Sequence, residues 1–271
     1  MSFYTSLSGL KNAQTDLGTI AHNIANAETN GFKKSDTQFA DLVAGGSMTD
    51  PRLVKGIGAT VTSITQNFGL GAIEQTSIAT DLAINGDGFF AMRNAESGNT
   101  SYTRNGNLML DGAGFLNDGS NNRLQMFATD AAGVITSPGT TIDALIPPLN
   151  GAGEEMAGVA IGKDGRISAT YADGSIEIVG RVALASFVAP TGLRQLGSQK
   201  WESTGISGAA TLGAPGVGRY GGLLSGALER SNVDLAEEMV SLITAQRNFQ
   251  ANAKAIDTAT QLSQTIINLR S

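Results

Sequence analysis

The chain has 271 residues, a formal net charge of −6 at pH 7 and a pI of about 4.8. Its 18 Lys and Arg residues are scattered, which excludes nucleic acid as an expected partner because such binding needs clustered basic side chains. No stretch approaches the roughly 18 uninterrupted apolar residues that a membrane-spanning helix requires, so no membrane insertion is expected. With no cysteine and only one histidine, disulfides, thiol chemistry and multi-histidine metal sites are excluded, and we expect no metal and no cofactor.

Glycine is abundant and aromatic residues are few. The 35 glycines and the aromatic share of 6% predict a β-rich body with many turns and without a dense aromatic core. The apolar share of 41% is ordinary for a globular protein of this length.

Apolar residues near the N-terminus recur in a seven-residue rhythm, which predicts a helix from about residue 3 to about residue 27. The series comprises Phe3, Leu7, Leu10, Gln14, Leu17, Ala21 and Ile24, with Gln14 as its polar member. Asn30 and Gly31 are predicted to end this helix with a left-handed stop. The segment MSFYTSLSGLKNAQ has neither a basic nor an apolar signal region. The protein is therefore expected either to stay in the cytoplasm or to be exported with its N-terminus intact.

Residues 31–80 carry mixed signals and are predicted to form a linker and the start of a β body. The stretch from Gly45 to Arg52 is predicted to be a loop. The alternating pattern from Gly58 to Ile64 predicts the first strand of the body.

Residues 81–222 are predicted to form the β body, because short apolar runs alternate with Asn-Gly and Asp-Gly pairs that favour tight turns. DLAINGDGFF, residues 81–90, and the following TSYTRNGNLMLDGAGFL predict two consecutive hairpins, with turns at Asn-Gly and with Asp111-Gly112 following at once. A small Gly- and Pro-rich insertion is expected near 129–160. A strand meander follows over 161–187 with turns at Asp164-Gly165 and Asp173-Gly174, and then a Gly-rich linker over 205–222. Neither the phosphate-loop nor the calcium-loop spacing is present, so these glycines are interpreted as turns.

A second helix is predicted from an N-cap at Ser231 or Asn232 to about Leu269, with acidic residues near its positive end. Its seven-residue series comprises Leu235, Met239, Leu242, Gln246, Phe249, Ala253, Ile256, Thr260, Ser263 and Ile267. The expected fold class is α+β: a mainly antiparallel β body, flanked by terminal segments 1–30 and 231–271 that form a coiled-coil-like inner domain.

The two seams indicate that the terminal helices take part in assembly, since they bury their apolar stripes fully only beside neighbouring copies. The predicted assembly residues are Leu7, Leu10, Gln14, Leu17, Ile24, Leu235, Met239, Leu242, Gln246, Phe249 and Ile256. The alternative is a helical pair packed within one chain. Gln14 and Gln246 are either register-setting contacts or ordinary polar residues at a fraying edge.

Four blocks, in order, carry a family resemblance. The first, residues 8–35, contains Asn23-Ile24-Ala25-Asn26 and Gly31-Phe32-Lys33; the others are DLAINGDGFF, YTRNGNLMLDGAGFL and residues 224–269. Together they resemble the bacterial flagellar axial proteins, the family of rod and hook subunits. The matching motif residues are Asn23, Asn26, Gly31 and Phe32. Asn23, Asn26 and Gly31 are interpreted as capping and turning the chain, with a role as an export signal as the alternative.

The C-terminal sequence SGALERSNVDLAEEMVSLITAQRNFQANAKAI is most similar to that of the hook proteins. The segment 129–160, however, is too short to hold the large outer domain of those proteins. The resemblance implies a structural subunit of the flagellar hook, a flexible tube that passes motor torque to the filament. A distal or proximal rod protein, a rigid drive shaft, is the alternative. The implied partners are copies of the chain in a helical tube, the other rod, hook-cap and hook–filament junction proteins, and the flagellar type III export apparatus. The implied location is the hook or basal body, extracellular or periplasmic.

Two other classes of function compete with this interpretation. An enzyme would need a carboxylate pair such as Asp164, Asp173 or Glu177, but these lie at predicted turns without an aromatic platform, so no enzymatic activity is expected. A soluble adaptor would use the same helices on a fixed partner, and it would form a small closed complex instead of an open polymer.

Overall fold

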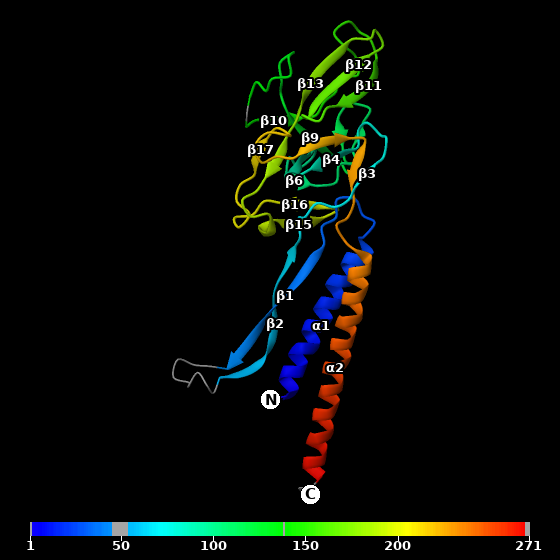
Figure 1. Ribbon diagram of the computed structural model, residues 1–271. Coiled ribbons are helices and arrows are strands. Elements are labelled where there is room, and N and C mark those ends of the chain that lie inside the picture. Colours follow the sequence, from blue (N-terminus) through cyan, green and yellow to red (C-terminus); the bar gives the residue numbers. More distant parts are fainter. Residues whose placement is uncertain (1, 45–53, 138, 269–271) are drawn as a thin grey trace. The chain divides into compact units, whose positions relative to one another are not determined.

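The computed structural model describes residues 2–44, 54–137 and 139–268 (Figure 1). The loop predicted from Gly45 to Arg52 and the helix end predicted at Leu269 lie outside these residues. The chain forms two compact units. The first contains Met1–Ala27, Lys34–Asn67 and Val233–Ser271, and the second contains Glu28–Lys33 and Phe68–Asn232. Two α-helices and mainly antiparallel strands confirm the predicted fold class.

The first unit pairs the two ends of the chain. It consists of α1 (Ser2–Ala25), β1 (Ser35–Ala44), β2 (Lys55–Gln66) and α2 (Leu235–Asn268). α1 packs against α2 and against the β1–β2 hairpin. Gly9 lies against Asn252, and Asn23 is hydrogen-bonded to Glu238, so the helices run antiparallel. These two contacts are 14 residues apart on each helix, which is two heptads, and the helices therefore stay in step as a coiled coil requires.

The β1–β2 hairpin replaces the irregular linker that the sequence suggested. Its pairing runs from Ser35 opposite Gln66 to Ala44 opposite Lys55, and the strand predicted from Gly58 to Ile64 lies within β2. Register shifts interrupt the pairing between Gln38 and Phe39 and between Leu42 and Val43. At each shift one residue of β2, Thr62 or Ile57, has no partner on β1, so the bulges lie in β2.

Both helix ends differ in detail from the prediction. α1 ends at Ala25, and Gly31, at φ +69°, instead donates its N–H to the carbonyl of Glu229 over 2.7 Å. α2 is capped by Asp234, whose carboxylate accepts the N–H groups of Ala236 at 2.8 Å and of Glu237 at 3.3 Å. The predicted caps Ser231 and Asn232 precede it, so the helix begins later than expected.

The second unit is a β body with one short 3-10 helix, η2 (Pro190–Gly192). Its strands are β3 (Ile73–Gln75), β4 (Leu82–Asn85), β5 (Phe89–Asn94), β6 (Thr100–Thr103), β7 (Met109–Leu110), β8 (Leu116–Asn117), β9 (Asn122–Phe127), β10 (Thr141–Asp143), β11 (Met156–Ile161), β12 (Arg166–Tyr171), β13 (Ile176–Val182), β14 (Leu184–Ser186), β15 (Arg194–Gly197), β16 (Lys200–Glu202), β17 (Thr211–Gly213), β18 (Gly222–Ser225) and β19 (Ala227–Glu229). The main sheet has the order β11-β12-β13-β9-β5-β6-β16-β15. β4 pairs with β18, and β3 pairs with β19.

The strand meander and the turn at Asp111-Gly112 are confirmed, but the two hairpins with Asn-Gly turns are wrong. β11, β12 and β13 pair in sequence, and Gly165 and Gly174 occupy their turns at φ +80°. β4 does not pair with β5, and β6 does not pair with β7; instead β5 pairs with β6, and β7 with β8. Gly106 serves a different purpose, since its carbonyl accepts the Leu82 N–H at 3.0 Å and a Cβ there would overlap the Leu82 carbonyl oxygen.

Two apolar clusters fill this unit. The larger one is mainly aliphatic and includes Leu82 of β4, Phe90 of β5 and Leu124 of β9. The smaller one is aromatic and contradicts the expectation from composition: Phe68, Phe89, Tyr102, Phe187 and Trp201 meet edge to face, with ring centroids 4.8–5.8 Å apart. Few aromatic residues still make a dense core when the fold concentrates them.

Candidate assembly surface

The predicted helical seams lie beside the most buried positions. On α1, Leu7, Leu10, Leu17 and Ile24 are half-buried, Gln14 is exposed, and the buried side chains are Ala13, Thr19, Ile20 and Asn23. On α2, Leu242, Phe249 and Ile256 are half-buried, Leu235, Met239 and Gln246 are exposed, and the buried side chains are Glu238 and Ala245. Apart from Ile20, the buried side chains of the two helices are thus small or polar, and the larger apolar residues are only half-buried or exposed.

Small residues at the centre let the two helices approach closely. A Cβ at Gly9 would lie 2.6 Å from the Asn252 side-chain oxygen, which is shorter than any van der Waals contact allows. Ala13 and Ala245 are also almost fully buried. The helical pair within one chain was the alternative to assembly in the sequence analysis, and the structure forms that pair.

A buried polar cluster fastens α1 to its partners. The Asn23 side chain, 1% exposed, donates to the Ser35 carbonyl at 2.9 Å and accepts the Ser35 N–H at 2.9 Å. It also donates to Glu238 Oε2 at 3.2 Å, and the Lys34 ammonium lies 3.9 Å from the other Glu238 oxygen. Burial raises the pKa of the nearby Asp16 carboxyl against a hydrogen bond from Thr37 that lowers it. Asn23 therefore joins α1, β1 and α2; it is not a helix cap. Asn26, by contrast, bonds back to His22.

Several large apolar side chains of this unit remain exposed. On α2 they are Met239, Val240 and Ile243, and near its end Leu262, Ile266 and Ile267, each 49–67% exposed. On the hairpin they are Phe39, Leu42, Val43 and Ile64. Large apolar side chains left exposed on α2 and on the hairpin mark surfaces that a partner covers. Met239 is thus the predicted assembly residue whose exposure best fits a contact outside the chain.

The Gly-Phe-Lys motif lies in the second unit, around a buried carboxylate. Lys33 Nζ is 2.5 Å from Glu229 Oε1 and 2.7 Å from the Gly69 carbonyl, and both charged side chains are fully buried. Arg104 Nη1 lies 3.4 Å from the other Glu229 oxygen and 2.9 Å from the Gly86 carbonyl. Burial lowers the pKa of the Lys33 ammonium, while the charge of Glu229 opposes this shift. The pair is thus hydrogen-bonded on both sides, as a buried ion pair must be.

Gly31 and Phe32 complete this arrangement. A Cβ at Gly31 would meet the Asn105 backbone nitrogen at 2.6 Å, so only glycine fits there, and Phe32 is buried beside it. The motif therefore anchors the segment 28–33 to β19 through Glu229.

Four residues of these clusters were not predicted as site residues from the sequence: Glu229, Arg104, Glu238 and Ser35. The only local signal was a charged residue within an apolar run, as in Ala227-Leu228-Glu229. The carboxylates considered for an enzyme are not brought together, because Asp164 and Asp173 lie in the turns at opposite ends of β12. Among the described helices, none has the length and hydropathy needed to cross a membrane.

Comparisons with known proteins identify the family. Three family models match: "Flagella basal body rod protein" over residues 3–33, "Flagellar hook protein FlgE/F/G D1 domain" over 83–169, and "Flagellar basal body rod FlgEFG protein C-terminal" over 224–269. The chain is 37% identical to the flagellar basal-body rod protein FlgG of Bacillus subtilis, covering 99% of this chain and 98% of that protein. It is 32% identical to FlgG of Borreliella burgdorferi, and the alignment covers 99% of this chain and 98% of that protein. The flagellar hook protein FlgE of Escherichia coli is 26% identical, with both chains fully covered. The chain therefore belongs to the flagellar rod and hook family of axial structural proteins.

Proposed function

We propose that this chain is a subunit of the flagellar basal-body rod. The observation that carries the proposal is the match in length and identity to the rod proteins: relatives of 31–37% identity, each covered to 98% or more, are named basal-body rod protein FlgG. The sequence of the C-terminal block favoured assignment to the hook, whereas the relatives favour the alternative assignment to the rod.

Length argues against the hook assignment. The alignment to the Escherichia coli hook protein spans 411 positions, against 271 residues in this chain, so at least 140 positions of that alignment have no counterpart here. The described residues of the segment 129–160 hold β10 and most of β11, and they form no further domain. A hook-sized outer domain is absent from the sequence itself.

The geometry suggests how such a subunit polymerises. Within one chain, α1 and α2 cover each other's small and polar seam, whereas Met239, Val240 and Ile243 still face outward. Neighbouring copies would cover this face and the exposed apolar residues of the hairpin, and repeated contacts of this heterologous kind build an open helical tube. The terminal segments 1–30 and 231–271 would form its inner wall. Its partners would be further copies, the other axial proteins, and the type III export apparatus that delivers the chain with its N-terminus intact.

Electron microscopy of basal bodies from a strain that lacks only this protein tests the proposal. A truncated rod, restored by the wild-type gene on a plasmid, is the expected result. A complete rod without a hook would transfer the assignment to the hook. If rod and hook were both intact, the assembly role itself would be wrong, and a small closed complex of defined stoichiometry would point to the adaptor alternative.

A further inference from the structure

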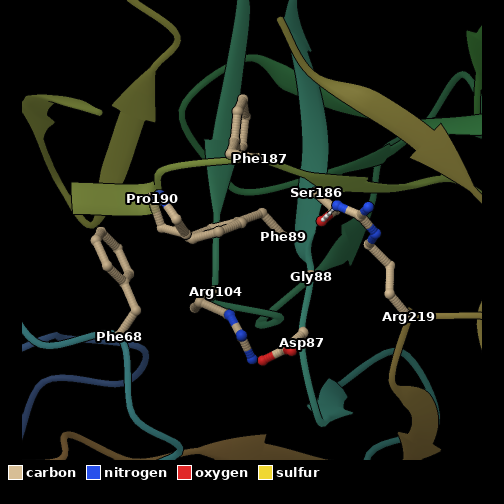
Figure 2. A pocket seen from close by; sticks show the side chains of 9 residues that line it. All are labelled: Phe68, Asp87, Gly88, Phe89, Arg104, Ser186, Phe187, Pro190 and Arg219. Atoms are coloured by element: carbon tan, nitrogen blue, oxygen red, sulfur yellow. Dashed lines mark hydrogen bonds between the residues drawn. The ribbon is translucent and has the colours of Figure 1, made fainter. Parts of the chain in front are cut away.

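A pocket of about 410 Å³ opens in the β body beside the aromatic cluster (Figure 2). One part of its wall is apolar and consists of Phe68, Phe89, Phe187 and Pro190; the rest consists of Asp87, Gly88, Arg104, Ser186 and Arg219. Figure 2 shows the two arginines on either side of Gly88, with the Asp87 carboxylate toward Arg104. The lining thus carries two guanidinium groups against one carboxylate.

Arg104 forms a buried part of the wall of this pocket. It is only 3% exposed and its guanidinium carbon lies 5.2 Å from the centre of the Phe89 ring. Nη1 is occupied by the Gly86 carbonyl and Glu229, but Nε is buried without a hydrogen-bond partner. A buried N–H without an acceptor costs free energy, so the guanidinium on this side of the pocket is not fully hydrogen-bonded.

Arg219 is the exposed cation of the pocket. Its Nη1 donates a long hydrogen bond of 3.4 Å to the Ser186 hydroxyl, and it forms no ion pair among the described residues. A planar guanidinium binds a carboxylate through two parallel hydrogen bonds, which a hydroxyl cannot provide. The pocket therefore suits a carboxylate on a short side chain, with aromatic rings beside it.

Such carboxylates gather at one end of the β11–β12–β13 sheet. The loop 149–155 and the turn 171–175 are joined there, because Ala172 donates its N–H to the Glu155 carbonyl and Asn150 bonds the Asp173 carboxylate at 3.1 Å. We call Glu154, Glu155, Asp173 and Glu177 the acidic tip. All four are exposed, none has an ion pair in the described structure, and neither 144–162 nor 167–180 contains a Lys or Arg.

The opposite end of the same sheet has a net positive charge, with three basic residues against the single carboxylate of Asp164, which pairs with Arg166, and it adjoins β18. Arg166 and Arg181 face each other in register there, next to Lys163, whose carbonyl accepts the Leu223 N–H at 3.1 Å. β12 separates the two ends by about 20 Å at 3.3 Å per residue. The sheet thus carries opposite charges at its two ends.

We propose that the pocket receives a carboxylate of the acidic tip of a second copy of this chain. Arg219 would pair with the incoming carboxylate, which would enter beside the Arg104 guanidinium. Two different surfaces of identical copies meet in such a contact, so it is heterologous and leaves each copy with one free tip and one free pocket, as an open-ended tube requires. The inference rests on the proposed function, because it presupposes that copies assemble.

Charge reversal in cells tests it. In a strain without the chromosomal gene, we would express Arg219→Glu, the pair Glu154→Arg with Glu155→Arg, and the three changes together, and count complete rods by electron microscopy. Because Arg219→Glu alone, or the two tip substitutions alone, would remove a desolvated charge pair, we expect each to reduce the number of complete rods about tenfold. The variant with all three substitutions should recover to within about twofold of the wild-type number. Arg194→Glu and Glu96→Arg, which change exposed residues outside pocket and tip, are matched controls expected to match the wild type.

The outcomes separate the two proposals. Wild-type rod numbers with Arg219→Glu overturn the pocket contact, and so does the absence of recovery in the combined variant when urea unfolding of the purified chains shows normal stability. Should Arg219→Glu unfold, Arg219→Gln takes its place with the same expected direction. The proposed function fails only if the strain without the gene still builds complete rods.

Discussion

Asn23 on α1 and Glu238 on α2 are joined by a buried hydrogen bond of 3.2 Å, although 215 residues separate them in the chain. The same amide exchanges two hydrogen bonds with the Ser35 backbone. Replacing it by alanine would leave the Ser35 N–H without its acceptor and the Glu238 carboxylate without this donor. We expect Asn23→Ala to destabilise the helical unit by about 2–4 kcal/mol, since each orphaned buried group costs about 1–3 kcal/mol.

Hydrogen exchange measured by mass spectrometry distinguishes the two units in this experiment. Asn23→Ala should speed exchange in α1, β1 and the first half of α2 and leave the strands of the β body unchanged. Asn26→Ala is the matched control, because the described hydrogen bonds of its amide go back to His22 in the same exposed turn. Equal effects of the two substitutions would show that the cluster is not what holds the unit together.

Glu229 is the buried counter-charge that Lys33 and Arg104 share. Glu229→Gln would leave Lys33 and Arg104 without a buried carboxylate, and removing one partner of a buried ion pair costs about 3–5 kcal/mol. Urea unfolding of the purified chain should show this loss. The control is Glu202→Gln, whose exposed ion pair with Arg194 should contribute below about 1 kcal/mol. A loss of similar size in both variants would contradict a special role for the buried pair.

Gly106 permits a close approach of two backbone segments. Gly106→Ala would place a methyl group on the Leu82 carbonyl oxygen, and because both atoms of the contact are fixed, one segment must move. We expect a loss of about 3 kcal/mol or more in urea unfolding, comparable to overpacking of a core. Gly112→Ala, where a Cβ meets open space at a negative φ, should be nearly neutral. A neutral Gly106→Ala would mean that the close approach is not needed.

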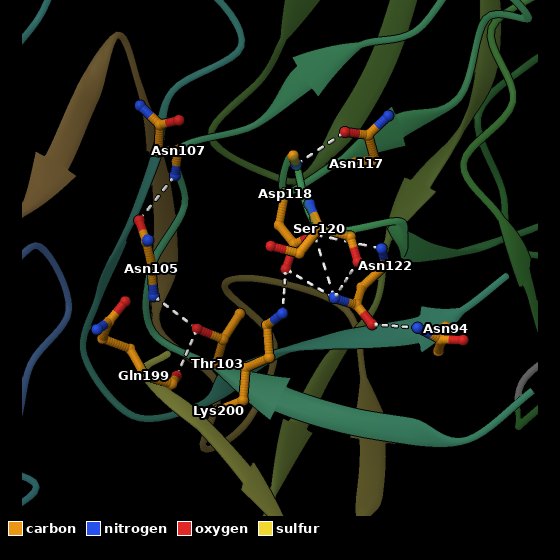
Figure 3. Close-up of polar contacts among 11 residues, drawn as sticks. Asn94, Thr103, Asn105, Asn107, Asn117, Asp118, Ser120, Asn122, Gln199 and Lys200 are labelled. Carbon is orange, nitrogen blue, oxygen red and sulfur yellow. Dashed lines mark hydrogen bonds and ion pairs between the residues drawn. The ribbon is translucent and has the colours of Figure 1, made fainter. Parts of the chain in front are cut away.

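Asp118 makes the β body sensitive to acid (Figure 3). Burial opposes its charge, but hydrogen bonds from Lys200, Ser120 and Asn122 outweigh burial and hold the pKa of this carboxyl below its ordinary 3.8. A carboxylate with a depressed folded-state pKa stabilises the fold fully above the unfolded-state pKa and loses this contribution as pH falls through the folded-state pKa. Asp118→Asn should therefore be less stable than the wild type at pH 7, and the difference should shrink below about pH 4.

Thermal unfolding from pH 7 to pH 2.5 measures this difference. The carboxyl of Asp143, held by Gln125, Arg93 and Arg123, also has a lowered pKa, so Asp118→Asn removes only part of the acid sensitivity. A constant difference between the two proteins over this range would rule out the Asp118 contribution.

Local sequence patterns predicted most helices and strands, but they did not predict which distant strands pair. The two helices and the β11–β13 meander followed from periodicity and from Asp-Gly turns, because these signals lie within a few residues of one another. β4 pairs with β18 and β3 with β19, across more than a hundred residues, and no local pattern encodes such a partner. The Asn-Gly pairs misled the prediction because glycine serves close backbone approach as well as turns.

The candidate site divides in the same way. The heptads located the contacting faces of the two helices to within about one residue. The prediction chose large apolar residues, which lie at the margins of the contact, whereas the small residues Gly9, Ala13 and Ala245 lie at its centre. Asn23, Gly31 and Phe32 entered through the family resemblance. Glu229 and Glu238 were missed because whether a carboxylate is buried depends on distant partners, which are Lys33 and Asn23 here.

The seam residues Leu17 and Leu242 provide the test of the assembly surface. Both are half-buried at the margins of the α1–α2 contact, so Leu17→Asp or Leu242→Asp would place an unpaired charge against an apolar stripe. We expect either variant to stop rod assembly in cells, while urea unfolding of the purified chain still shows a cooperative transition of the β body. Gln246→Asp, at an exposed seam position, is the matched change of charge and should leave the helical unit folded. If Leu242→Asp supported normal flagella, the terminal helices would not be what holds copies together, and the exposed hairpin residues Phe39 and Val43 would be the next to change.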